Sequence, residues 1–157
     1  MHDLTHVPIP VWSSKGWLGP EHVEARKLAN GRFVILCPPR FAYGLAVGDE
    51  IELDAATPAG FRVTRHSGNL TVWVYCQSDA AAAAVSATAA KVLPRVSGVV
   101  EGTPSQMVII TVPLHAGWSE IEVTLNELAR KFLDTSWEFA NVYEVEDGGT
   151  PLNWWNR

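Results

Sequence analysis

Strict alternation of apolar and polar residues marks the segment from Glu50 to Asp54. Ile51 and Leu53 stand between carboxylates there, and residues 61–66 repeat the alternation after a Pro-Ala-Gly turn. Side chains of a strand point alternately to its two faces, so this pattern predicts two half-buried strands. The short turn between them predicts that they pair antiparallel.

The residues before this pair predict more strands. Asn30-Gly31 lies between strand-like runs at 21–28 and 32–37, and Asn-Gly is the strongest short hairpin signal. Residues 1–20 combine prolines, glycines and two tryptophans without any period, which predicts an extended arm. We expect Trp12 and Trp17 to attach the arm to the body, because an exposed Trp pair favours aggregation.

From Leu70 onward the pattern becomes mixed. Residues 70–76 are apolar on both faces and predict a central strand, and Ser78-Asp79 begins an alanine-rich helix that Pro94 ends. A hairpin follows over residues 96–113, and a closing strand over 137–145.

The helix between those last elements has the clearest pattern in the chain. Ser119 and Glu122 have the spacing of a capping box, and Glu127 and Lys131 that of an i,i+4 ion pair. Its apolar residues recur on one face: Ile121, Leu125, Leu128 and Phe132.

These elements predict an α+β protein. A small curled β-sheet or partly open barrel over 21–76 is followed by a β-α-β-β-α-β, ferredoxin-like sandwich over 70–145, and the two share the strand at 70–76. The arm at 1–20 and a tail at 146–157 complete the predicted organisation.

Composition indicates a globular protein with a basic partner. The chain has 157 residues, 47% of them hydrophobic and 18% charged, and its longest apolar run is far too short to span a membrane. No secretory signal follows Met1, so we expect a cytoplasmic protein. The net charge of −5 opposes nucleic-acid binding and suits a cationic protein.

The two cysteines predict buried, reduced thiols. Cys37 and Cys76 each lie in a strand-like run without a nearby second cysteine, which argues against zinc. A disulfide between them is the weaker interpretation in a reducing compartment. The five histidines have no metal-ligand spacing, and the sequence predicts no metal and no cofactor.

No catalytic signature occurs in the sequence. Phosphate-binding loops, dinucleotide fingerprints, zincin motifs and nucleophile elbows are all absent. His66 and Ser67, with Asp49, are the candidates for a small acid-base or nucleophilic site. The favoured alternative is a polar turn, because no third group is seen that would orient the histidine.

Two further sets of residues are candidates for binding. Phe41, Tyr43 and Trp73 are candidates to line a ligand cleft between the two halves, with packing inside the barrel as the favoured alternative for Phe41 and Tyr43. An acidic set is the candidate for docking a cationic protein, with a solvated surface as the alternative. Its members are Glu50, Glu52, Asp54, Glu144, Glu146 and Asp147.

Several of these segments together resemble an uncharacterised bacterial family known only as a domain of unknown function. The resemblance lies in Phe41-Ala42-Tyr43-Gly44-Leu45, in Gly48-Asp49, and in Ser67-Gly68 followed by Thr71. It covers most of residues 21–145 and implies a shared fold and a cytoplasmic bacterial setting, but no activity. Asn69 stands where the family commonly has a histidine.

The sequence leads to three hypotheses. The first is a non-catalytic immunity-type protein that neutralises a basic toxin, such as a nuclease, by protein–protein contact. The second is a small-molecule binding module or small enzyme that uses a cleft between the halves. The third is a structural or regulatory partner in a larger assembly. The sequence leaves open the oligomeric state and whether Trp12, Trp17, Trp154 and Trp155 are buried or form a contact surface.

Overall fold

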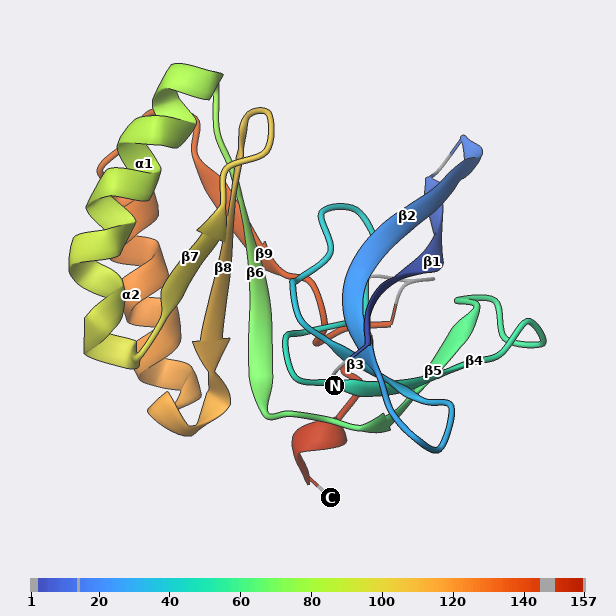
Figure 1. Ribbon diagram of the computed structural model, residues 1–157. Helices are drawn as coiled ribbons and strands as arrows, with labels where there is room; N and C mark the ends of the chain where they lie inside the picture. The colour runs from blue at the N-terminus through green and yellow to red at the C-terminus, as the bar shows by residue number, and fades with distance from the viewer. Residues whose placement is uncertain (1–2, 14, 145–148, 157) are drawn as a thin grey trace. The chain divides into compact units, whose positions relative to one another are not determined.

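Two compact units make up the chain in the computed structural model (Figure 1). The structure describes residues 3–13, 15–144 and 149–156. The first unit contains residues 1–67 and 143–157, and the second contains residues 68–142. The chain therefore leaves the first unit at Ser67 and returns to it at Tyr143.

The first unit is built on a five-stranded antiparallel sheet with the order β1-β2-β3-β4-β5. Its strands are β1 (Leu4–Ser13), β2 (Gly16–Lys27), β3 (Phe33–Ile35), β4 (Glu50–Leu53) and β5 (Phe61–Arg65). The predicted hairpin at Asn30-Gly31 is confirmed, because β2 pairs antiparallel with β3 around it.

The predicted strand pair at 50–54 and 61–66 is confirmed as β4 and β5. Ile51 lies opposite Val63, and Glu52 lies opposite Arg62, so apolar and polar residues separate onto the two faces. The apolar face is the core of this unit. Its fully buried members include Ile9, Ile35, Leu45 and Ile51.

The prediction of an extended arm at 1–20 missed the strand pairing of this segment. Residues 4–13 form β1, which pairs with β2 along its whole length, and Val7, Ile9 and Val11 face the core. The prolines in this segment argued against a strand, because proline has no backbone N–H to donate. Pro10 lies opposite Pro20, where neither residue needs to donate a ladder hydrogen bond, so the strand accommodates both.

The second unit is a four-stranded antiparallel sheet with the order β7-β8-β6-β9 and two helices. Figure 1 shows α1 and α2 on the same face of this sheet. In chain order the elements are β6 (Asn69–Tyr75), α1 (Asp79–Val92), β7 (Val99–Gly102), β8 (Met107–Pro113), α2 (Trp118–Arg130) and β9 (Ser136–Phe139). The expected central position of β6 is confirmed, since β8 and β9 flank it.

The two helices begin in different ways. The side chain of Ser78 accepts a hydrogen bond from the Ala81 N–H at the start of α1, as expected from the sequence. The predicted capping box of α2 is wrong, because the N-cap of that helix is Gly117, with φ 92°, rather than Ser119, and the helix begins two residues earlier than predicted, at Trp118. The predicted pair of Glu127 with Lys131 is also replaced, since Glu127 pairs with Arg95 at 2.8 Å.

The remaining elements are short. Three 3₁₀ turns span Leu93–Val96, Leu114–Ala116 and Trp154–Asn156. The predicted closing strand at 137–145 is shorter in the structure and spans Ser136–Phe139. The whole is a mixed α+β protein with two antiparallel sheets, and in the described residues neither sheet closes into a barrel. None of the described helices has the length and apolar character needed to cross a bilayer.

Candidate functional site

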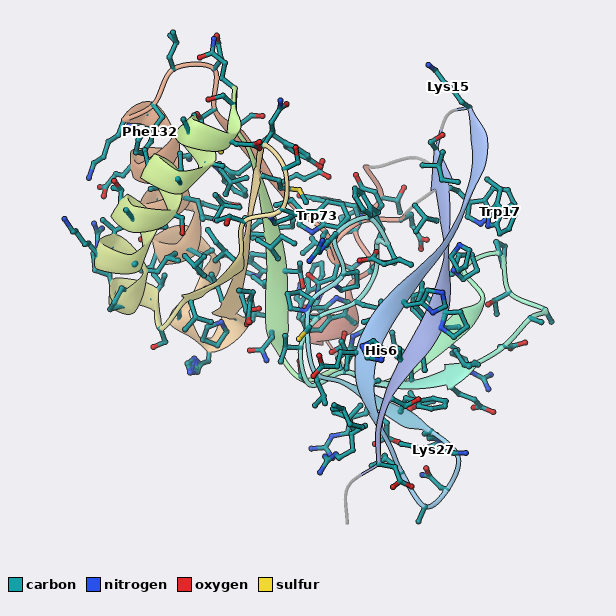
Figure 2. The ribbon with its side chains drawn as sticks, turned by 45° about the horizontal axis from the view of Figure 1, so that its top comes forward. His6, Lys15, Trp17, Lys27, Trp73 and Phe132 are labelled. Atoms are coloured by element: carbon teal, nitrogen blue, oxygen red, sulfur yellow. The ribbon has the colours of Figure 1, made fainter. Side chains whose placement is uncertain are left out.

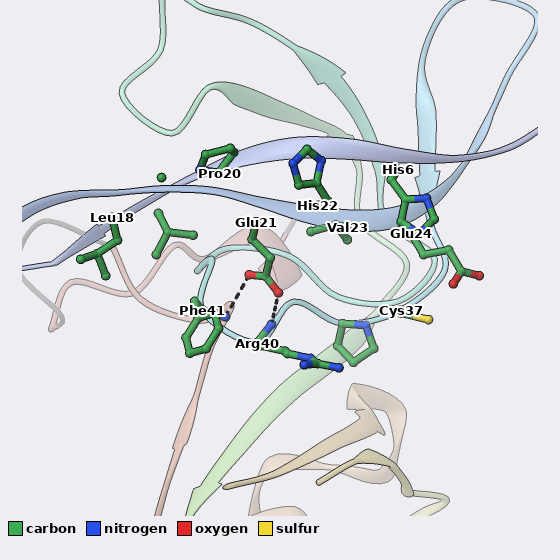
Figure 3. Close-up of a pocket in the computed structure, with 13 residues that line it drawn as sticks. His6, Leu18, Pro20, Glu21, His22, Val23, Glu24, Cys37, Arg40 and Phe41 are labelled. Carbon is green, nitrogen blue, oxygen red and sulfur yellow. Dashed lines mark hydrogen bonds between the residues drawn. The ribbon is translucent and has the colours of Figure 1, made fainter. Parts of the chain in front are cut away.

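A cavity of about 600 Å³ opens in the first unit beside the β1–β2 ribbon (Figure 3). Strands β1 and β2 form one wall, and the segment at 37–41 forms the other. The lining residues are His6, Val11, Leu18, Gly19, Pro20, Glu21, His22, Val23, Glu24, Cys37, Pro38, Arg40 and Phe41. All of them belong to the first unit.

Glu21 fixes the second wall to the first. Its carboxylate accepts hydrogen bonds from three consecutive backbone N–H groups, those of Arg40 at 2.6 Å, Phe41 at 3.0 Å and Ala42 at 3.0 Å. A carboxylate that accepts several backbone N–H bonds is held firmly, and so is the loop that donates them. The cavity is therefore a preformed feature of this unit.

The cavity offers different chemistry along its length. Figure 3 shows Leu18 and Phe41 toward one end, Arg40 in the middle, and His6, Glu24 and Cys37 toward the other end. Leu18 and Phe41 are 66% and 59% exposed. Within the described part of the chain, the Arg40 guanidinium makes no ion pair or hydrogen bond.

The predicted catalytic candidates come together, but as parts of a turn. Asp49 is 1% exposed, and its carboxylate accepts hydrogen bonds from the Ala46 N–H at 2.9 Å and the Ser67 N–H at 2.8 Å. Burial raises the pKa of Asp49 from 3.8 to about 6, and the hydrogen bonds from Ser67 and Ala46 oppose this shift. His66 stacks on Trp154 with ring centroids 4.7 Å apart.

This arrangement holds the backbone together. Asp49 ties the turn at 46–49 to Ser67, the residue at which the chain leaves the first unit. Both of its oxygens accept hydrogen bonds from backbone N–H groups, as in a polar turn.

The residues predicted for a ligand cleft are separated. Phe41 lines the cavity, and Tyr43 is 36% exposed. Trp73 belongs to the second unit, where it is buried in a cluster with Met107, Ile109 and Ala140 (Figure 2). Trp73 is therefore a core residue, and it does not line the cavity that contains Phe41.

The acidic set is largely engaged in local interactions. Glu50 pairs with Arg32 at 3.1 Å, and Glu52 pairs with Arg62 at 3.0 Å. Asp54 accepts the Ala56 N–H at 3.0 Å. Glu144 is exposed, while Glu146 and Asp147 lie outside the described residues. The β4 carboxylates thus form a charge-balanced surface rather than a free anionic patch.

An aromatic surface that the sequence did not predict lies at the end of the β1–β2 hairpin. Trp12 and Trp17 lie directly opposite each other on the two strands and are 57% and 61% exposed. Figure 2 shows Trp17 and Lys15 at the far end of this hairpin. Strand β3 pairs only with residues 25–27 of β2, so this end of the ribbon has two strands. We call Trp12 and Trp17 the hairpin tip.

Both the tryptophans and the cysteines divide into buried and exposed side chains. Trp154 is buried, so only part of the tryptophan set is available for contact. Cys76 is buried as predicted, but the prediction for Cys37 is wrong, because its thiol is exposed in the cavity wall. Cys37 and Cys76 do not form a disulfide with each other. Among the described residues, no group of three or more His, Cys, Asp or Glu side chains has an arrangement suited to a metal ion.

Fold and surface together define a two-unit α+β protein with an exposed aromatic hairpin and a small preformed cavity. The chain belongs to the family described as Domain of unknown function (DUF4265), which matches residues 21–135. The resemblance to an uncharacterised family of this kind is thereby confirmed.

One solved structure has a similar fold. A solved structure described as a novel crystal structure of a hypothetical protein from Neisseria gonorrhoeae is similar to this chain, with a TM-score of 0.65. The two are 17% identical, and the match covers 89% of this chain and 96% of that one. At this identity the likeness concerns the fold alone. No curated protein matches significantly.

Proposed function

We propose that this chain is a non-catalytic binding protein of the immunity type, which neutralises a basic toxin, such as a nuclease, by covering part of its surface in the cytoplasm. The observation that carries the proposal is the hairpin tip. Trp12 and Trp17 form a cross-strand pair that remains more than half exposed.

Exposed tryptophans on a two-stranded ribbon are costly unless a partner covers them. Large apolar surface patches favour association, and Trp is among the residues most enriched at binding hot spots. The ribbon end holds these side chains on paired strands, so little conformational entropy is lost when a partner binds. The tip thus has the properties expected of a protein-binding surface.

The proposed basic character of the partner rests on the whole-molecule charge of −5. The carboxylates of Glu50 and Glu52 add little to it, because Arg32 and Arg62 pair with them. We therefore place the main contact at the hairpin tip rather than along β4.

We also infer that the second unit is a ferredoxin-like module. The order of elements, β6-α1-β7-β8-α2-β9, and the sheet order β7-β8-β6-β9 support this assignment. Many unrelated functions occur on such a module, so the assignment describes architecture and carries no activity.

The second candidate function is a small-molecule module. One observation favours it, since a cavity of about 600 Å³ has the size of many ligand sites. The acid-base residues proposed for such a site do not line it, because Asp49 and Ser67 bond to each other at a turn outside the cavity. We therefore rank it second.

Co-expression with the toxin domain of the neighbouring reading frame tests the first proposal. We expect the wild-type protein to protect the cells and to co-purify with the domain. The double variant Trp12→Ala and Trp17→Ala should bind at least about tenfold more weakly, because each truncation removes a hot-spot side chain.

Leu133→Ala is the matched control, because Leu133 is 75% exposed in the second unit, away from the hairpin tip in the sequence. Its affinity for the toxin domain should equal that of the wild type. A harmless neighbour that does not co-purify would remove the immunity assignment, and unchanged binding of the double variant would remove the tip from the contact surface.

A further inference from the structure

We propose that the cavity beside the β1–β2 ribbon binds an extended segment of the partner protein in which a carboxylate side chain follows an apolar one. The inference rests on the proposed function, because it takes the partner to be a protein. It names what the cavity itself recognises, which is separate from the contact at the hairpin tip.

The first support is the fixed position of the cavity wall. Three backbone N–H groups of residues 40–42 donate to the carboxylate of Glu21, so Arg40 and Phe41 stand in place before any ligand arrives. A preformed wall avoids the entropy of ordering a loop on binding.

The second support is charge. The Arg40 side chain lines the cavity between its two ends, and in the described part of the chain no side chain pairs with its guanidinium. The negative charge of Glu21 is already directed at three N–H donors, and Glu24 lies at the far end near His6. A planar guanidinium with free donors matches a carboxylate well, because two parallel hydrogen bonds form between them.

The third support is the apolar end. Leu18 and Phe41 lie there with more than half of their surface exposed. Cavities for small ligands bury most of the ligand, whereas walls this open would leave a small molecule largely in water. A side chain that belongs to a larger partner is held by contacts outside the cavity, so an open wall suits it.

The edge of the sheet indicates how the segment is recognised. Strand β1 is at one end of the sheet order, and Pro8 and Pro10 lie on it. Since Pro10 faces Pro20, these two prolines occupy positions whose N–H groups would point away from β2. An added strand would find few donors there, so recognition must come from side chains in the cavity.

Synthetic peptides test the inference on the full-length protein. The probe is acetyl-Gly-Ser-Leu-Asp-Ser-Gly-amide, together with the same peptide carrying Asn or Lys in place of Asp. We expect the Asp peptide to shift the backbone amide signals of Leu18, His22 and Phe41 in nuclear magnetic resonance titrations. The Asn peptide should bind about threefold to tenfold more weakly, and the Lys peptide more weakly still.

Two variants assign the effect. Arg40→Gln should remove the preference for Asp over Asn, and it should leave the fold intact because the side chain is exposed. Arg62→Gln is the matched control, since Arg62 pairs with Glu52 on the neighbouring strand and does not line the cavity. That variant should keep the full preference for Asp.

Three results would overturn the inference. These are the absence of any shift at Leu18, His22 and Phe41 with every peptide, a preference for Asp that survives Arg40→Gln, and binding of phenylacetate as tight as that of the peptide. The two proposals fail separately. If the toxin domain co-purifies while the peptides fail, only this inference is lost, and if the peptides bind while no partner co-purifies, only the immunity assignment is lost.

Discussion

Asp49 shows how a single carboxylate links two distant parts of the first unit. Its two oxygens accept hydrogen bonds from the Ala46 N–H and the Ser67 N–H, which are 21 positions apart in the sequence. Such a buried group stabilises the turn geometry, but it must lose water to do so. The cost of removing the charged carboxylate from water exceeds the gain from the two hydrogen bonds, so the pKa of Asp49 is raised.

We predict that Asp49 makes stability fall as the pH rises between about 4 and 6. The pKa of Asp49 is about 6 in the folded protein and 3.8 without the fold, so the folded state binds more protons in this window. The difference corresponds to roughly 3 kcal/mol, present as stability below the window and lost above it. Urea unfolding at a series of pH values measures it.

Asp49→Asn should remove this pH-dependent contribution. The difference in free energy of unfolding between wild type and variant should therefore change between about pH 4 and 6. The variant should also be less stable overall by about 1–3 kcal/mol at low pH, because one backbone N–H then faces an amide donor. Asp54→Asn is the control, since Asp54 accepts one N–H in a surface turn. A constant difference between wild type and Asp49→Asn from pH 4 to 7 would contradict the prediction.

Gly60 gives a second test at the scale of single residues. It has φ +78°, and a Cβ placed there would lie 2.7 Å from two ring carbons of Pro10. We predict that Gly60→Ala lowers the free energy of unfolding by more than about 2 kcal/mol, because backbone strain and a steric clash add together.

Gly31→Ala separates the two causes. Gly31 has φ +81°, but a Cβ added there would meet nothing within 4 Å, so strain alone should cost about 1 kcal/mol. If urea unfolding showed the same decrease in the free energy of unfolding for both variants, the added methyl group at residue 60 would not clash with Pro10.

The β1–β2 ribbon and the loop at 37–42 form the element on which the cavity depends. The loop carries no regular structure, and Glu21 holds it through consecutive N–H groups. These bonds connect residues about twenty positions apart in the chain. Their loss should therefore release the loop while β1 and β2 stay paired.

We predict that Glu21→Gln increases amide hydrogen exchange at Arg40, Phe41 and Ala42. A glutamine keeps one carbonyl oxygen and loses the charge, so we expect destabilisation of about 1–3 kcal/mol and faster exchange at these three amides than elsewhere in the unit. Glu24→Gln is the control on the same strand, and in that variant amide exchange at residues 40–42 should match the wild type. Unchanged protection of residues 40–42 in Glu21→Gln would contradict the role of Glu21.

Local patterns in the sequence predicted the elements that depend on local chemistry. Asn30-Gly31 predicted its hairpin, and the alternation in Glu50–Asp54 predicted β4. Ile51 is buried as predicted, whereas Leu53, at the end of the strand, is 41% exposed. The strand at residues 4–13 was missed because its prolines argue against a strand in the sequence. In the structure they occupy positions where no backbone N–H has to donate to the neighbouring strand. The start of α2 was misplaced because Gly117 takes φ 92° and caps the helix without a side chain.

The cavity could not be predicted for a different reason. Of its lining residues the sequence singled out Phe41 for a ligand cleft, and the wall that carries Phe41 is held by hydrogen bonds to the distant Glu21. Pairing across such distances is set by the whole sheet rather than by neighbouring residues. The exposed Trp12 and Trp17 were expected to pack on the body, and nothing in their spacing shows that they lie opposite each other beyond the reach of β3.

At the scale of the whole molecule, charge and local recognition act separately. The net charge of −5 spreads over both units, whereas the proposed carboxylate site depends on one guanidinium in the first. The negative charge of the entire chain attracts a basic partner over a long range. Arg40 needs only one acidic side chain on that partner's surface to form an ion pair. Long-range charge should therefore govern how fast the partner associates, and the hairpin tip and the cavity should govern how long it stays bound.

We predict that the double variant Glu101→Lys and Glu122→Lys slows association with the toxin domain. Both glutamates are exposed in the second unit and form no ion pair among the described residues, and each substitution makes the net charge of −5 more positive by two. At low salt the association rate should fall about tenfold with an unchanged dissociation rate, and at about 0.5 M salt the difference should nearly vanish through screening. Stopped-flow fluorescence of the tryptophans measures both rates. An association rate that stays the same or rises in the variant would show that the partner is not basic, while the assignments of the hairpin tip and of Arg40 would stand on their own tests.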